Sequence, residues 1–250
     1  MKNLPTLLLI VLVFYLLFGC DDQPVNKVDP PGRVDLISSS ADTSAVEFGI
    51  DAIYLNESPN KNSIFFEWRP NSESSLAGYE IYRSVFPKQN YTALARVVEN
   101  FGVIDTFYID NSVSLNIRYY YFIRAFDDLD QYSEPSDTIS YEVFENPVLS
   151  YPVSIIGNVN APEFIWDFPA LAVPQYFVFR LEISENEIYY RLYSKLIEIS
   201  VEYDPHQEWT LAELTQETGL SAGKYRWRID SIGSEDNQGA ESAWFIFIIQ

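Results

Sequence analysis

Residues 119–126 read YYYFIRAF, and residues 225–232 read YRWRIDSI. Every second residue of each stretch is apolar or small: Tyr119, Tyr121, Ile123 and Ala125 in the first, and Tyr225, Trp227, Ile229 and Ser231 in the second. Because side chains of a strand alternate between its two faces, each stretch predicts a strand with one face in a core. The likeness of the two stretches predicts that the chain contains the same unit twice, each copy of roughly 100 residues.

Shorter runs of the same kind lie around both stretches. They are 64–68 (IFFEW), 79–83 (YEIYR) and 138–144 (TISYEVF) in the first half, and 164–168, 176–183, 187–193, 196–203 and 244–249 in the second. Clusters of turn-forming residues separate them, and only 209–217 (WTLAELTQE) has a helix-like spacing. This pattern predicts an all-β protein, with Trp68 and Trp166 in the cores of two sandwiches.

Two apolar positions on the predicted strands point away from the core. Tyr120 and Phe122 alternate with the core positions of their strand, so we expect them on the outer face as an interaction surface. In the second half, Phe177 and Phe179 alternate with Tyr176 and Val178, so one of these pairs must also face outward. Contact between the two units and an external ligand are both open explanations for this outward apolar surface.

The N-terminus has the layout of a secretory signal. Lys2 precedes an apolar stretch over 7–18, which is shorter than the roughly 20 residues of a membrane-spanning helix. Small Gly19 then precedes Cys20, the single cysteine of the chain. The ending LFGC resembles the lipobox of bacterial lipoproteins. This resemblance implies that residues 1–19 are removed and that Cys20 is lipidated and anchors the protein in a membrane.

The segment that follows Cys20 carries prolines and no apolar periodicity. Residues 20–31 are therefore expected to form a lipidated cysteine and a flexible tether. Asp21 and Asp22 resemble both an inner-membrane retention signal and a surface-export signal of lipoproteins. The membrane and its leaflet therefore stay open, and the expected location is the cell envelope.

Several segments resemble the fibronectin type III family. In the first half these are 76–83 (LAGYEIYR), Tyr119 in the place of the tyrosine corner with Val113 six residues before it, and 133–136 (SEPS). In the second half they are 219–228 (GLSAGKYRWR) and 241–244 (ESAW). The resemblance implies two tandem immunoglobulin-like β-sandwiches, at 32–145 and 146–250. The stretch from 31 to 68 is longer than usual, and 45–55 is expected to add a strand or hairpin.

The charge balance limits the partners of this protein. The chain has 36 acidic and 16 basic side chains, a net charge of −20. Such a chain repels the phosphates of nucleic acids and the headgroups of an anionic bilayer. The acidity suits an exported protein that must stay soluble, and calcium or basic partners are the functional alternative.

Chemically reactive groups are scarce. The single histidine, His206, is expected in a surface loop, and no serine lies in a G-x-S-x-G elbow. One histidine and one acylated cysteine cannot make a zinc site. The run 127–130 (DDLD) lacks the glycine and distal glutamate of a calcium loop, so we expect a turn there. No catalytic residue, metal or cofactor is predicted.

The sequence therefore favours a non-catalytic, membrane-anchored lipoprotein whose modules mediate protein interaction, adhesion or envelope assembly. The alternative is a glycan-binding surface lipoprotein that feeds a transporter or hydrolase, motivated by the aromatic content of 16%. The protein or glycan partner is unknown, and the link from fold to function is one of analogy.

Overall fold

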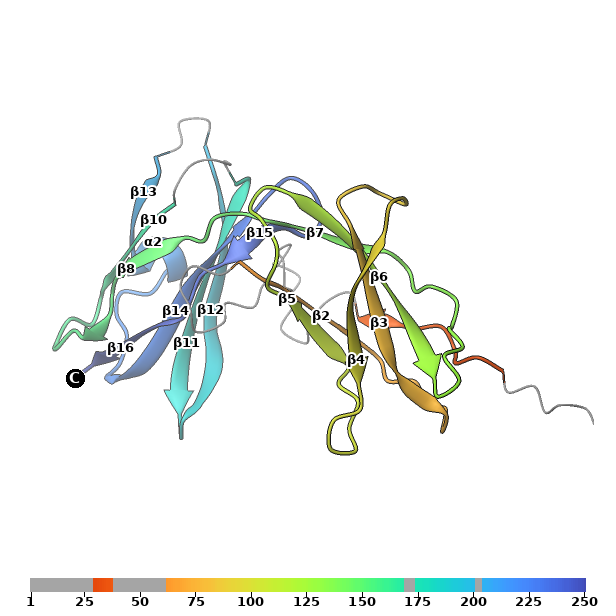
Figure 1. Cartoon of the computed structure of the whole chain (residues 1–250). Helices are drawn as coiled ribbons and strands as arrows, with labels where there is room; N and C mark the ends of the chain where they lie inside the picture. Colours follow the sequence, from red (N-terminus) through yellow and green to blue (C-terminus); the bar gives the residue numbers. More distant parts are fainter. Residues whose placement is uncertain (1–28, 38–61, 169–173, 201–203) are drawn as a thin grey trace, which may run out of the picture. The chain divides into compact units, whose positions relative to one another are not determined.

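The structure is a computed structural model that describes residues 29–37, 62–168, 174–200 and 204–250 (Figure 1). Nearly every regular element in these ranges is a strand. Within them, no helix has the length and apolar character that crossing a membrane requires. Residues Pro31–Gln250 form one compact unit. The predicted signal segment and the predicted addition at 45–55 lie outside the described residues.

Among the described residues, the first sandwich has seven strands in two sheets. They are β1 (Leu36–Ile37), β2 (Ile64–Trp68), β3 (Leu76–Ser84), β4 (Thr92–Val98), β5 (Phe107–Asp110), β6 (Arg118–Asp127) and β7 (Ile139–Val143). One sheet has the order β1-β2-β5, and the other has the order β4-β3-β6-β7. Three strands facing four in this order is the arrangement of an immunoglobulin-like, fibronectin type III-like sandwich.

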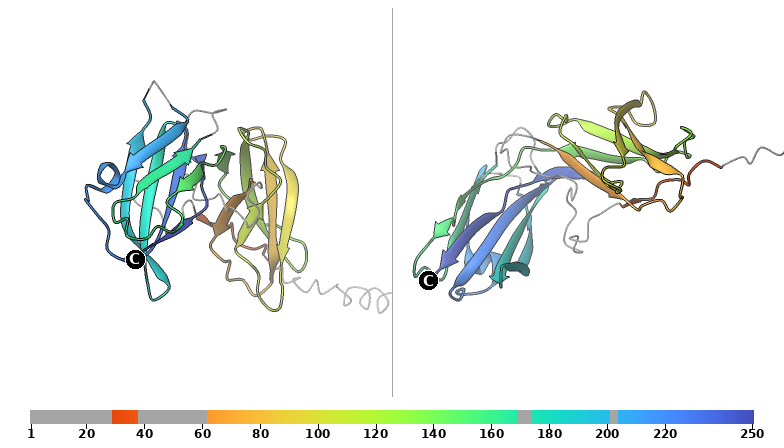
Figure 2. Two further views of the ribbon diagram at one scale, coloured as in Figure 1. Left: turned by 90° about the vertical axis from the view of Figure 1, so that its left-hand side faces the viewer. Right: turned by 60° about the horizontal axis from the view of Figure 1, so that its bottom comes forward.

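The second sandwich repeats this arrangement. Its strands are β8 (Val148–Tyr151), β9 (Ser154–Ile155), β10 (Glu163–Asp167), β11 (Tyr176–Glu185), β12 (Ile188–Glu198), β13 (His206–Thr210), β14 (Gly223–Ile232), β15 (Gln238–Glu241) and β16 (Phe245–Ile249). One sheet has the order β13-β10-β8, and the other runs β12-β11-β14, with β15 and β16 both paired to β14. Figure 2 shows the layers of each sandwich from two further sides.

Matching hydrogen bonds relate the two sandwiches residue by residue. The Tyr119 hydroxyl accepts a bond from the backbone N–H of Ser114 (3.0 Å), and the Tyr225 hydroxyl donates to the carbonyl of Ser221 (2.9 Å). Tyr119 thus forms the corner predicted from the sequence, and Tyr225 forms an equivalent one, because each ties the start of its strand to the loop before it.

The last strands are also fixed in the same way. Ser136 exchanges two hydrogen bonds with the backbone of Ile123, and Ser242 does the same with Ile229, all at 2.9–3.0 Å. The separation between Ser136 and Ser242 equals that between Tyr119 and Tyr225. The predicted internal repeat is therefore confirmed at the level of individual contacts.

Aromatic rings fill both cores. Trp68 packs edge-on against Tyr79, with ring centroids 5.1 Å apart, and Phe164 packs the same way against Trp227 at 5.1 Å. Trp166 is also fully buried. The prediction that the tryptophans and the corner tyrosines are core residues is confirmed, and such edge-to-face pairs add to the stabilisation from burial alone.

Two sequence predictions need correction, and two strands of the first sandwich were missed. The runs 187–193 and 196–203 were expected as two strands, but β12 continues from Ile188 to Glu198. Ser194 and Lys195, which lie between the two runs, pair with Arg180 and Phe179 of β11 in unbroken register, so the strand has no turn there. His206 is the first residue of β13 rather than part of a loop. The missed strands are β4 and β5, for which the sequence analysis made no prediction.

Other expectations hold, and one stays a prediction. Helix α2 (Leu211–Thr215) lies within the predicted helical segment and begins at a capping box of Thr210 and Glu213. The turn at 127–130 is present, since Asp127 accepts bonds from the N–H groups of Leu129 and Gln131. The domain boundary at residue 146 stays a prediction. Strand β7, which precedes it, pairs with β15, which follows it, through two residue pairs.

Candidate binding face

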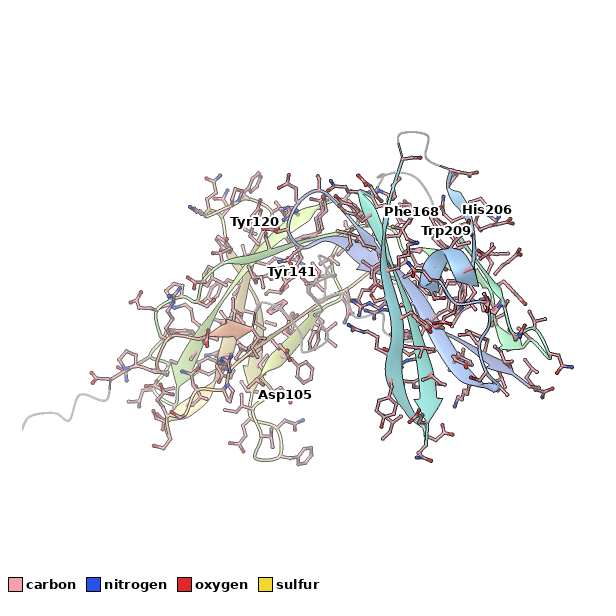
Figure 3. The ribbon with its side chains drawn as sticks, turned by 180° about the vertical axis from the view of Figure 1, so that it is seen from behind. Asp105, Tyr120, Tyr141, Phe168, His206 and Trp209 are labelled. Atoms are coloured by element: carbon pink, nitrogen blue, oxygen red, sulfur yellow. The ribbon has the colours of Figure 1, made fainter. Side chains whose placement is uncertain are left out.

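Strand β6 places Tyr120 and Phe122 where the sequence predicted them. Tyr119, Tyr121 and Ile123 are buried, while the two residues between them are half-buried on the opposite face of the sheet. Figure 3 labels Tyr120 toward one end of the first sandwich, with Asp105 at the other end. Their orientation is confirmed, and their role in binding stays a prediction.

Phe122 is part of a cluster that the sequence did not reveal. Its ring stacks on Tyr82 of β3, with centroids 4.6 Å apart and an interplanar angle of 12°, and it also packs against Tyr91 at 4.8 Å. The Tyr82 hydroxyl donates a 2.5 Å hydrogen bond to Glu80. Burial, and then this bond, raise the pKa of Tyr82 to about 12. The ring contact with Phe122 and the hydrogen bond to Glu80 together position the Tyr82 side chain.

Two arginines extend the same surface. The Arg96 guanidinium lies 3.9 Å from the ring centroid of Phe126, pairs with Asp130 at 2.8 Å and donates to the Tyr132 hydroxyl at 3.2 Å. Arg124 lies over the ring of Tyr132 at 5.2 Å. We refer to this outer surface of the first sandwich as the aromatic face; its members are Tyr82, Tyr91, Tyr120, Phe122, Tyr132, Arg96 and Arg124.

The second sandwich carries a different outer surface, built on strand β14. Arg226 and Arg228 lie over the ring of Trp244 at 4.2 and 4.9 Å, and Arg226 also lies over Tyr189 at 4.2 Å. Arg226 pairs with Glu182 at 2.6 Å, and Arg228 pairs with Glu241 at 2.8 Å. The basic residues at every second position of 224–228 could have revealed this stack from the sequence.

Beside this stack, strand β11 is buried on both faces. Phe177 and Phe179 are in the core, and the outward positions Val178 and Arg180 are buried as well. Arg180 pairs with Asp230 at 3.0 Å. The expected outward pair on this strand is therefore Tyr176 and Val178, and only Tyr176 keeps some exposure.

One buried carboxylate, that of Asp110, has a shifted pKa, but hydrogen-bond donors already contact both of its oxygen atoms. Asp110 is 1% exposed and accepts bonds from Arg83 (2.7 Å), Tyr121 (2.9 Å) and both donors of Ser112 (2.7 and 2.9 Å). Burial raises the pKa of Asp110, but these bonds outweigh burial and leave the pKa below its usual value. The group stabilises the fold and has no open side for a substrate.

His206 does not form a catalytic arrangement. Its Nδ1 lies 2.7 Å from Asp167 and its Nε2 lies 3.3 Å from Glu208, so both ring nitrogens face carboxylates. Bonds to Asp167 and then to Glu208 raise the pKa of His206. Across the described ranges, no three His, Cys, Asp or Glu side chains gather as ligands for a metal ion.

Comparison with known proteins adds little to this description. No family model matches the chain, and no curated protein matches it. Among solved structures, the crystal structure of the FN1–FN3 domains of chicken CNTN1 is similar at 14% sequence identity. The similarity covers 88% of this chain and 68% of the CNTN1 chain, with a TM-score of 0.34. Similarity at this level carries no weight, and the assignment of the fold rests on the strand order and the two tyrosine corners described above.

Proposed function

We propose that this protein is a cell-envelope lipoprotein that binds a protein partner through the aromatic face and performs no catalysis. The observation that carries the proposal is the composition of that face. Tyrosine and arginine dominate it, and these residues are enriched in protein interfaces and in their energetic centres. The cross-strand stacking of Tyr82 on Phe122 holds the surface in place before binding, which lowers the entropy cost of association.

The same geometry favours a protein over a glycan. A sugar stacks on an exposed ring face, but Tyr82 and Tyr91 both pack against the ring of Phe122. Tyr120 has small cross-strand neighbours instead, since it lies in register with Ser84 and Ser140. A glycan would therefore have to rely on Tyr120, whereas a protein could contact the whole face.

The proposed anchor is a lipid on Cys20, followed by the tether 21–31. One acyl chain gives only marginal membrane binding, so stable anchoring requires more than one chain on the mature N-terminus. Replacing Cys20 by alanine should abolish incorporation of labelled fatty acid and release the protein from the membrane fraction. Retention of both would overturn the anchor.

The binding face is tested by site-specific photocrosslinking in the native host. A photoreactive phenylalanine analogue at Tyr120 should yield a discrete protein adduct. The matched control is the same analogue at Glu67, which is half-buried on the outer face of the opposite sheet. Equal adducts at both positions would contradict the proposal. Calorimetric binding of a polysaccharide that Tyr120→Ala abolishes would favour the glycan alternative.

A further inference from the structure

A fully exposed aromatic side chain lies at the tip of the connection between β4 and β5. Phe101 is 100% exposed and Val103 is 63% exposed. Asn100 and Val103 exchange two backbone hydrogen bonds, of 2.8 and 3.1 Å, and close a tight hairpin turn. Phe101 and Gly102 occupy its two central positions with φ values of 52° and 82°. Both values are positive, as in a type I′ turn.

The local fold gains nothing from an aromatic residue at this position. A bulky residue with positive φ is uncommon, and asparagine is the preferred first central residue of such a turn. The exposed ring also buries no apolar surface within the described residues. A strained position that holds an exposed apolar side chain points to a role outside the fold.

A second apolar tip lies at the same end of the sandwich. Leu129 is 64% exposed in the turn after β6. Gly78 of β3 is in register with Val98 of β4 on one side and with Phe126 of β6 on the other. Strand β3 therefore lies between β4 and β6. The strands from which the two turns extend are about 10 Å apart.

The chain also enters the first sandwich at this end. The N–H of Gly32 donates to Glu73 at 2.6 Å, and Asn71 donates to the Gly32 carbonyl at 2.9 Å, so the first residues lie against the β2–β3 loop. That loop adjoins the turn of Leu129, because Asp128 donates to the carbonyl of Ser75 at 3.2 Å. Ten residues separate Cys20 from Pro31, so an extended chain places these two residues at most about 40 Å apart.

From this juxtaposition we propose that Phe101, Val103 and Leu129 dock the first sandwich on the phospholipid bilayer that holds the lipid of Cys20. This inference rests on the anchor proposed above. The exposed acidic residues of the same end include Asp35, Glu99, Asp105, Asp128 and Asp130. They would repel an anionic surface, so the proposed docking requires a zwitterionic bilayer surface, and its attraction comes from apolar insertion.

The test uses the full lipidated protein in vesicles of phosphatidylcholine and phosphatidylethanolamine. Because the anchor acylates the single native cysteine, Phe101→Cys provides a unique free thiol for an environment-sensitive fluorophore. We expect a blue shift on reconstitution and quenching by spin-labelled lipids. The matched control is Phe86→Cys, which is 50% exposed in the loop between β3 and β4 at the other end, and whose label should show neither change.

The possible results separate the two proposals. If the protein floats with the vesicles but the label at position 101 stays in a water-like environment, docking is wrong and the anchor stands. If the protein does not float with the vesicles, the anchor fails and docking fails with it. A second variant carries Phe101→Asn and Leu129→Asn with the label at Val103→Cys. It should lower the docked fraction about tenfold or more relative to Val103→Cys alone. An unchanged docked fraction would overturn the role of these side chains.

Discussion

The substitution Asp110→Asn removes one charge from a buried ion pair and leaves its shape intact. Asp110 is 1% exposed, and the Arg83 side chain that pairs with it at 2.7 Å is 24% exposed. Breaking a buried pair by neutralising one partner costs about 3–5 kcal/mol, because the other charge loses its compensation. Since water partly reaches Arg83, we expect a loss of about 3 kcal/mol, a large share of the 5–15 kcal/mol typical of a domain.

Hydrogen exchange and urea denaturation together measure this loss. Exchange in peptides from β2 and β6 reports the first sandwich separately from the second. The matched control is Asp130→Asn, which neutralises an exposed pair with Arg96 (side chains 74% and 42% exposed) and should cost at most about 1 kcal/mol. Its backbone has a positive φ of 55°, which asparagine tolerates. If Asp110→Asn cost no more than this control, the account of the buried pair would be wrong.

Acid dependence gives an independent check of the same residue. The folded state holds the pKa of Asp110 below the value of about 3.9 that an unfolded aspartate has. The carboxylate therefore contributes its full stabilisation above about pH 4, and this is lost as pH falls through the folded-state pKa. We expect the stability of Asp110→Asn to change less than that of the wild type in this range.

Three further changes test other parts of the structure. Gly78→Ala should destabilise the first sandwich by about 3 kcal/mol, since a Cβ atom there would lie 2.3 Å from the Val97 carbonyl; urea denaturation measures this loss, and a neutral effect would contradict the close strand packing. Tyr225→Phe should cost about 1 kcal/mol through loss of the corner bond, and equal exchange protection in both proteins would refute this. Asp167→Asn should lower the pKa of His206 in an NMR titration, because the nearer of its two carboxylate partners loses its charge; an unmoved pKa would contradict the pairing. The wild-type histidine favours the folded state below about pH 6.5 and loses this contribution as pH rises through its raised pKa.

The sequence predicted the fold wherever a strand buries one face and exposes the other. Strand β6 is the example, since its alternation identified both the core residues and the outward pair Tyr120 and Phe122. The edge strand β4 was missed because its residues are mostly exposed or half-buried, so its apolar pattern is weak. Strand β12 was divided in two because the polar residues Ser194 and Lys195 interrupt its apolar pattern, although both pair regularly with β11.

The candidate site was predictable only in part. Tyr120 and Phe122 could be placed on a face by alternation within one strand. Their neighbours Tyr82 and Tyr91 come from other segments, and only the register of β3 against β6 brings the first of them to Phe122. The pairing of Arg83 with Asp110 depends in the same way on tertiary contacts that no local pattern encodes.

Intact-mass spectrometry of the protein extracted from the membrane fraction tests the central claim most directly. The account predicts a mature chain that begins at Cys20 and carries the added mass of its acyl chains, with fragment ions that place this mass on the first residue. A chain that retains residues 1–19, begins at another residue or carries an unmodified Cys20 would contradict the lipid anchor and the bilayer docking that depends on it.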